Sequence, residues 1–134
     1  MLNLSNYLSK MKITEIAFVV YPVTNLARAR EFYEGVLGLE QSRFYGGGEK
    51  GMIEYDIGGG TLAIGCGAEH FNPSAGGGCA SLEVDDFEEA VKRVTEAKCP
   101  VFLPPYESPV CHMMGVSDPD GNSVVIHRRK PGQA

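Results

Sequence analysis

The sequence predicts an α+β fold in which two tandem βαβββ modules form a cup-shaped mixed sheet with helices on its convex side. The first observation is a duplication: residues 18–29 and 79–90 share one pattern at a constant offset of 61 positions. Each copy is an apolar strand, then Asn25 or Asp86, then an amphipathic segment. The second observation is length, since 134 residues make one domain that buries roughly two-thirds of its unfolded surface. A duplicated unit predicts one binding site between two similar halves.

The first module opens with a strand and a helix. Residues 13–23 are apolar and β-branched, which predicts a buried strand. Asn25 follows as a helix cap, because its amide oxygen can accept a free backbone N–H. Gly38 ends the helix. The apolar face of this helix is formed by Leu26, Ala29, Phe32, Tyr33, Val36 and Leu37.

Two further strands complete the first module. Residues 52–57 alternate apolar and polar side chains, and residues 61–65 form a second run after a glycine turn. We therefore expect the first module to cover residues 13–69, after an N-terminal arm at 1–12.

The second module repeats this order over residues 79–130, after a Gly/Pro/Ser-rich linker at 70–78 and before a tail at 131–134. A strand at 79–84 leads to Asp86 as the helix cap. The inward face of the helix is predicted to be Phe87, Ala90, Val91, Val94 and Ala97.

Three shorter strands are expected at the end of the second module. Residues 101–103 form the first, which Pro104-Pro105 ends because proline donates no ladder hydrogen bond. Residues 110–116 and 123–127 pair across the turn sequence at 118–122, Asp-Pro-Asp-Gly-Asn.

Composition excludes several classes of partner. A net charge of −5 argues against nucleic acid and against an anionic membrane surface. No apolar run approaches the ~18 residues of a membrane span, and the N-terminus lacks the apolar core of a signal peptide. Four cysteines without a CxxC pair are typical of reduced thiols. We therefore expect a cytoplasmic protein whose partner is a small molecule.

Strand alternation separates the helix side of each sheet from the cup. The predicted helix-side core is Ile53, Tyr55, Ile57, Leu62, Ile64, Leu82, Val84, Val124 and Ile126. The predicted cup residues are Glu54, Asp56, Ala63, Cys79, Ser81, Glu83, Val125 and His127, with Ile16, Phe18 and Val20 from the first strand. For strand 110–116 two choices stay open: either Cys111 and Met113 or His112 and Met114 face the cup.

Two segments carry a resemblance to a known superfamily. One runs from Val23 through Phe32-Tyr33 to Leu39, and the other is the turn at 118–122 with the strand after it. Over about residues 13–130 the chain resembles the vicinal-oxygen-chelate superfamily, which holds glyoxalases, extradiol dioxygenases, epimerases and bleomycin-resistance proteins. The resemblance implies the paired-module fold and a homodimer.

Enzymes of this superfamily hold a divalent metal in the cup, with His, Gln or Glu ligands from the first and last strand of each module. Carried over position by position, these ligands fall on Phe18, Cys79, Val125 and Ala63 (Ile64 if the register shifts). Only Cys79 could bind a metal, and a thiolate is a poor ligand for chelating substrate oxygens. The expectation is no metal and no other cofactor; the alternative is a displaced site of His127, Cys79 and one carboxylate.

The leading hypothesis is a glyoxalase- or bleomycin-resistance-like protein that binds a small, partly apolar molecule without the divalent metal. The alternative is a glyoxalase-like lyase or isomerase, or a dioxygenase, that uses a displaced metal or a Glu/His acid–base pair; whether catalysis occurs stays open. The catalytic candidates are His127 and Glu54, and Tyr106 is a candidate lid on a Pro-rich loop. The predicted ligand-binding residues are Phe18, Glu54, Asp56, Cys79, Glu83, Tyr106, Val125 and His127.

Overall fold

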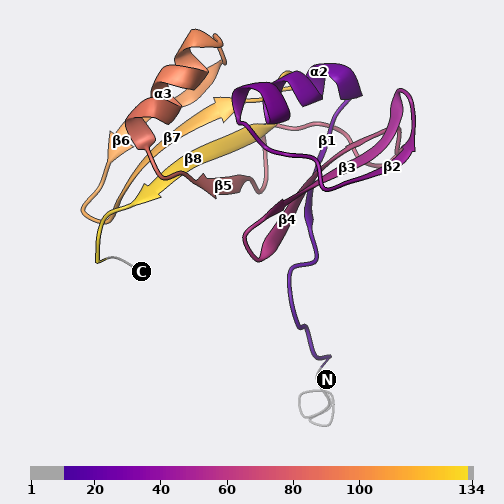
Figure 1. Cartoon of the computed structure of the whole chain (residues 1–134), viewed down its shortest axis with the longest axis horizontal. Coiled ribbons are helices and arrows are strands. Elements are labelled where there is room, and N and C mark those ends of the chain that lie inside the picture. Colours follow the sequence, from indigo (N-terminus) through magenta and orange to yellow (C-terminus); the bar gives the residue numbers. More distant parts are fainter. Residues whose placement is uncertain (1–10, 133–134) are drawn as a thin grey trace, which may run out of the picture.

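Two four-stranded mixed sheets, each with its own helix, make up the computed structural model, which describes residues 11–132 (Figure 1). The first module comprises β1 (Val19–Pro22), α2 (Leu26–Arg30) continued by the π-helical η1 (Glu31–Val36), β2 (Arg43–Gly47), β3 (Lys50–Ile57) and β4 (Gly60–Cys66). The second comprises β5 (Ala80–Glu83), α3 (Phe87–Glu96), β6 (Val101–Glu107), β7 (Cys111–Ser117) and β8 (Ser123–Arg129).

The strand order is the same in both sheets. It is β1-β4-β3-β2 in the first and β5-β8-β7-β6 in the second, with β1 parallel to β4 and β5 parallel to β8. The remaining neighbours are antiparallel. The predicted α+β fold of two tandem βαβββ modules is confirmed. No helix within residues 11–132 is long and apolar enough to cross a membrane.

The helix caps form as predicted. The Asn25 side chain accepts a hydrogen bond from the Arg28 amide at 2.9 Å, and the Asp86 side chain accepts one from the Glu89 amide at 3.1 Å. Gly38 follows the first helix with φ +78°, a conformation that costs glycine little.

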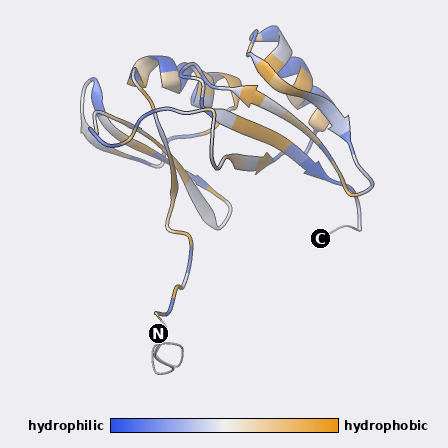
Figure 2. Ribbon diagram, turned by 180° about the vertical axis from the view of Figure 1, so that it is seen from behind, coloured by the Kyte–Doolittle hydropathy of each residue, from blue (hydrophilic) through white to orange (hydrophobic). Residues whose placement is uncertain are grey.

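Both modules contribute to one hydrophobic core beneath the helices. Tyr33 and Tyr55 are fully buried, and Val94 of α3 packs in the same cluster as Met114 of β7. The helices also touch directly, because Arg93 Nε donates to the Val36 carbonyl at 2.8 Å. Figure 2 shows hydrophobic stretches along the strands and mixed hydropathy along the helices, as expected for elements buried on one side.

Six of the nine predicted helix-side core residues are buried, Leu82 and Val84 are half-buried, and Ile57 is exposed. Ile57 is 39% exposed because it ends β3 next to the glycine turn. Ala97 is exposed because it lies at the C-cap of α3, where the chain turns away from the sheet. The predicted inward position of Ala97 is therefore wrong; Cys99 packs against the core instead.

The turn before β8 ties the two modules together. The buried Asp118 carboxylate accepts a hydrogen bond from the Tyr33 hydroxyl at 2.9 Å. Asn122 Nδ2 donates to Asp118 at 2.9 Å and to the Pro22 carbonyl at 2.7 Å. We call Tyr33, Asp118 and Asn122 the module clamp. Beside it, the Tyr21 hydroxyl donates to the Ser123 carbonyl at 2.7 Å and joins β1 to β8.

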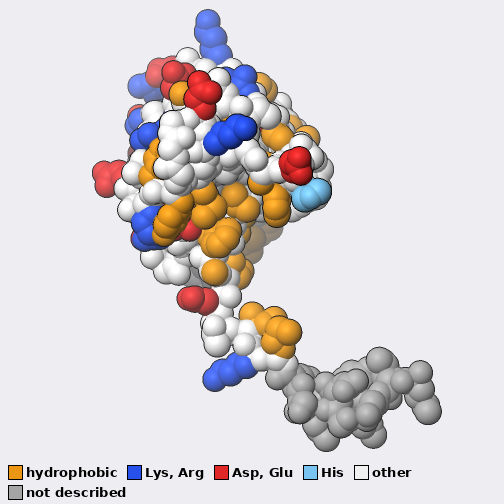
Figure 3. Space-filling view, turned by 90° about the vertical axis from the view of Figure 1, so that its right-hand side faces the viewer, with side chains coloured by type: hydrophobic (Ala, Val, Ile, Leu, Met, Phe, Trp, Pro, Cys, Tyr) orange, Lys and Arg blue, Asp and Glu red, His pale blue; other side chains and the backbone are white. Residues whose placement is uncertain are grey.

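The first strand is shorter than predicted. Val19 pairs with Leu62, and β4 begins only two residues earlier at Gly60, so residues 13–16 extend past the start of β4. This extension leaves Ile13 and Ile16 82% and 76% exposed. Figure 3 shows hydrophobic side chains on the segment that extends from the body of the protein. Residues 1–10 of the predicted arm, and residues 133–134 of the predicted tail, lie outside the described residues. The homodimer stays a prediction.

Two strands of the structure differ from the sequence prediction. β2 was not predicted, because its sequence is rich in glycine. β6 does not end at Pro104-Pro105 but continues to Glu107, with one shift of pairing register between Val101 and Leu103 and another between Leu103 and Tyr106. The prolines are tolerated because β6 is an edge strand, where one side of the backbone needs no ladder hydrogen bonds.

Candidate functional site

The helix-free face of the second sheet carries a row of four side chains. Glu83 pairs with His127, His127 with Met113, and Met113 with Tyr106, so the four residues cross the sheet from β5 to β6. Directly opposed residues in neighbouring strands share a face. The prediction that Glu83 and His127 lie on one face is thus in accord with the register, and Tyr106 joins them.

A short hydrogen bond links two residues of this row. His127 Nδ1 lies 2.6 Å from Glu83 Oε1, and Glu83 Oε2 accepts from the Arg129 amide at 2.7 Å. Burial tends to raise the pKa of Glu83, but the hydrogen bonds from Arg129 and His127 outweigh it and lower this pKa below its usual value. Because a carboxylate only accepts, Nδ1 carries the proton of this bond and Nε2 stays available for another partner.

The first sheet has an equivalent row with different chemistry. Pro22, Gly65, Met52 and Tyr45 pair in the same order across β1, β4, β3 and β2. Methionine and tyrosine occupy the same places in both rows. The His–Glu pair of the second module is replaced in the first by glycine and proline, which offer no side-chain polar group. The duplicated modules therefore present one polar row and one apolar row.

An apolar cavity of about 520 Å³ lies along the first strand. We call it the β1 groove. Its size lies within the usual range for sites that bind small molecules. Phe18 before β1, β1 itself and the apolar row contribute to its lining, together with Phe71 of the linker. The side chains that define it are Phe18, Val20, Pro22, Tyr45, Met52 and Phe71.

The two acidic residues predicted in the first half of the cup share one arginine. Arg43 Nε lies 2.5 Å from Glu54 Oε1, and Arg43 Nη1 lies 3.0 Å from Asp56 Oδ2. Hydrogen bonds from Arg43 and then Thr61 lower the pKa of Asp56. Sequence reasoning missed Arg43 because it lies in the unpredicted strand β2. This pairing makes Glu54 and Asp56 poor candidates for a general base.

The positions that correspond to metal ligands do not fit a metal. Phe18, Ala63 and Val125 have no donor atom in their side chains, and Cys79 is exposed just before β5. Among residues 11–132, no group of three or more His, Cys, Asp or Glu side chains is placed to hold an ion. The alternative site of His127, Cys79 and a carboxylate is therefore not assembled here.

The structure also shows on which side of the second sheet the residues of strand β7 lie, and where Tyr106 lies. His112 lies on the helix side with its ring 5.4 Å from that of Phe87, which leaves Cys111 and Met113 on the helix-free side and settles the open choice for this strand. Tyr106 is 53% exposed and lies within β6, so its predicted place on a loop is wrong.

The comparisons with known proteins agree with this architecture. The family model described as the Glyoxalase/Bleomycin resistance protein/Dioxygenase superfamily matches residues 15–126. The chain belongs to this superfamily. No curated protein matches the sequence of this glyoxalase-superfamily chain.

Several solved structures share its fold. TnmS3, an antibiotic binding protein from Streptomyces sp. CB03234, is 22% identical with a TM-score of 0.72, covering 90% of this chain and 100% of that one. Lactoylglutathione lyase from Agrobacterium tumefaciens is 21% identical with a TM-score of 0.68, covering 87% and 95%. A glyoxalase/bleomycin resistance protein from Streptomyces sp. CB03234 is 22% identical with a TM-score of 0.67, covering 84% and 98%. At these identities the likeness establishes the fold alone.

Proposed function

We propose that this protein binds a small, partly apolar molecule in the β1 groove without the divalent metal of its enzymatic relatives. The observation that carries the proposal is that Phe18, at the position where the superfamily resemblance places a metal ligand, lines the groove with an apolar ring. Val20 and Met52 continue the same apolar wall. One of the similar folds belongs to an antibiotic binding protein, which is in accord with a binding role for this scaffold.

The β1 groove favours a flat or aromatic ligand. Phe18, Tyr45 and Phe71 are 44%, 52% and 62% exposed, so three aromatic rings border a cavity that already has ligand size. Aromatic rings gain from offset or edge-to-face contact with another ring, beyond the gain from area alone. Polar groups are scarce in the groove, so we expect burial of apolar surface to supply most of the affinity.

Replacing Phe18 with arginine is expected to weaken binding of the uncharged fluorescent probe N-phenyl-1-naphthylamine at least about tenfold, because it removes a large apolar contact and adds a charge to the groove. Fluorescence titration measures this change. Val110→Arg is the matched control, since Val110 is 50% exposed and lies in the β6–β7 connection, away from the groove.

Two results would contradict the proposal. One is equal weakening of probe binding, or none, in the two variants. The other is near-stoichiometric divalent metal in protein purified without chelators or a His-tag, measured by plasma mass spectrometry.

The hydrogen bond between His127 and Glu83 favours one alternative, an isomerase that works by acid–base catalysis. Glu83 orients the ring, and Nε2 of a neutral His127 can take a proton from a carbon acid and return it to the neighbouring carbon. The adduct of methylglyoxal with glutathione is the substrate to try first, because its conversion to a thioester needs only this carbon-to-carbon proton shift and the transfer of the hydroxyl proton to the neighbouring carbonyl oxygen.

For this alternative, His127→Ala is expected to lose about 100-fold or more in kcat/KM, with Glu83→Gln losing less. His112→Ala is the matched control, since its ring packs on the helix side. The first measurement is whether the parent protein forms the thioester at all, followed by absorbance. An inert parent, or an active His127→Ala variant, would exclude this mechanism.

A further inference from the structure

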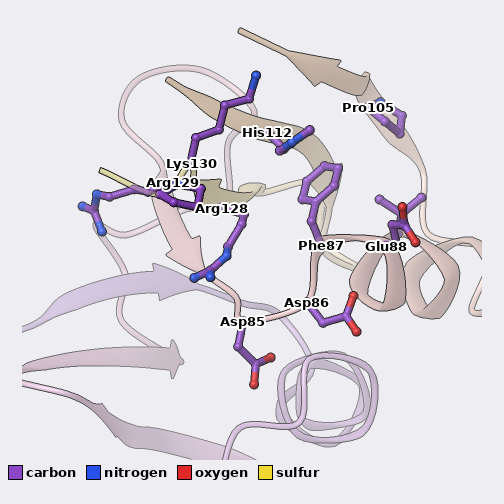
Figure 4. Close-up of a pocket in the computed structure, with 11 residues that line it drawn as sticks. Asp85, Asp86, Phe87, Glu88, Pro105, His112, Arg128, Arg129 and Lys130 are labelled. Carbon is purple, nitrogen blue, oxygen red and sulfur yellow. The ribbon is translucent and has the colours of Figure 1, made fainter. Parts of the chain in front are cut away.

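A second cavity, of about 630 Å³, opens on the opposite side of the second sheet from the His127 row. It lies where α3 begins above the start of β7 and the end of β8 (Figure 4). His112 and Arg128 are direct cross-strand partners there, on the helix side of the sheet. The cavity shares no lining residue with the β1 groove.

One wall of this cavity is aromatic and apolar. The rings of Phe87 and His112 lie 5.4 Å apart at an interplanar angle of 33°. Val91 of α3 and Pro105 of β6 continue the wall. Such a surface accommodates a further planar ring, and a cation of the ligand could also approach the face of Phe87.

The other walls carry opposite charges that do not neutralise one another. Arg128 Nη1 lies 3.9 Å from Glu83 Oε2, at the outer limit of an ion pair, and the Arg128 side chain is 45% exposed. Asp85 and Glu88 line the cavity from the start of α3. Within the described part of the chain no ion pair joins either carboxylate to a basic residue. Figure 4 shows Arg128 extending toward the side of Asp85, whereas the side chain of Arg129, which also lines the cavity, extends in another direction.

We propose that this cavity is a second ligand site, for a small aromatic zwitterion. The ring of the ligand packs against Phe87 and His112, its carboxylate pairs with the Arg128 guanidinium, and its ammonium group pairs with Asp85 or Glu88. Asp86 takes no part, because its carboxylate caps α3. A cavity of this size holds one ligand of amino-acid size with room for water. The site is independent of the β1 groove and of any activity there.

The absence of tryptophan from the chain provides a direct assay. The fluorescence anisotropy of added L-tryptophan, excited beyond the tyrosine band, reports binding without background from the protein. Indole-3-propionate lacks the ammonium group and tryptamine lacks the carboxylate. We expect saturable binding of L-tryptophan, with each of the other two probes bound about tenfold more weakly because one charge-assisted contact is lost.

Two arginine variants locate the site. Arg128→Gln is expected to weaken L-tryptophan and indole-3-propionate about tenfold and to leave tryptamine unchanged, whereas Arg43→Gln, the matched control in β2, leaves all three unchanged because Arg43 does not line the cavity. The proposal would be overturned if L-tryptophan binding did not saturate, if the three probes bound with equal affinity, or if the two variants had equal effects. Loss of L-tryptophan binding in Phe18→Arg would also overturn it, because the probe would then occupy the β1 groove. Failure of this site leaves the proposed function of the β1 groove untouched, since the two assays use different probes.

Discussion

Replacing Asp118 with alanine is expected to lower the free energy of unfolding by about 3–5 kcal/mol. Asp118 is only 2% exposed. It accepts hydrogen bonds from the Tyr33 hydroxyl, from Asn122 Nδ2, and from the backbone amides of Asp120 and Asn122, all between 2.8 and 2.9 Å. Alanine leaves these donors without a partner in a site that water does not fill easily, and each unsatisfied donor costs about 1–3 kcal/mol. Urea unfolding followed by circular dichroism measures the change.

Asp118→Asn and Asp85→Ala complete the experiment. Asparagine keeps one acceptor oxygen and replaces the other by an NH₂ group. We therefore expect Asp118→Asn to lower the free energy of unfolding, but by less than Asp118→Ala does. Asp85 is exposed and makes no ion pair within residues 11–132, so its removal is expected to change stability by less than about 0.5 kcal/mol. A cost for Asp118→Ala as small as that for Asp85→Ala would mean that the module clamp does not hold the modules together.

The module clamp also shows which part of the fold can be predicted from the sequence. The residues at 118–122 predict a turn from their types alone, because aspartate, glycine and asparagine favour turns for local reasons. Nothing local indicates that Asp118 meets Tyr33, which lies 85 positions earlier. The length of β1 also depends on residues far away in the sequence. Its β-branched residues predict a strand from residue 13, but the start of β4 at Gly60 limits where pairing can begin.

The candidate site divides in a similar way. Strand alternation alone predicts that Glu54, Glu83 and His127 avoid the helix side, and the register agrees. It does not predict partners across strands. Arg43 forms an ion pair with Glu54 because β2 pairs with β3 in one particular register. Tyr106 joins the His127 row only because the pairing of β6 with β7 shifts after Leu103. Register depends on turns and tertiary packing, so a single sequence leaves it open.

Raising the pH above about 10 is expected to destabilise the protein steeply through two buried tyrosines. Burial and then the charge of Asp118 raise the pKa of Tyr33, and burial and then a hydrogen bond to Glu34 raise the pKa of Tyr55. In the unfolded chain both hydroxyls ionise near their ordinary pKa of about 10. Below that pH both states keep the protons, and stability is at its full value. Above it only the unfolded state releases them, so each tyrosine costs about 1.4 kcal/mol per pH unit, or about 5 kcal/mol for the two at pH 12.

The pH dependence of two phenylalanine variants isolates this effect from every other alkaline change. Tyr33→Phe removes one of the two protons, so the slope of unfolding free energy against pH between 10 and 12 should fall by about 1.4 kcal/mol per unit. Its stability at pH 8 also falls, because Asp118 loses a donor, but that loss shifts the curve without changing its slope. Tyr45→Phe is the matched control, since Tyr45 is 52% exposed, and its slope should equal that of the parent. Equal slopes in all three proteins would mean that Tyr33 ionises as readily in the folded state as in the unfolded one, and its hydroxyl could then not be the buried donor that holds Asp118.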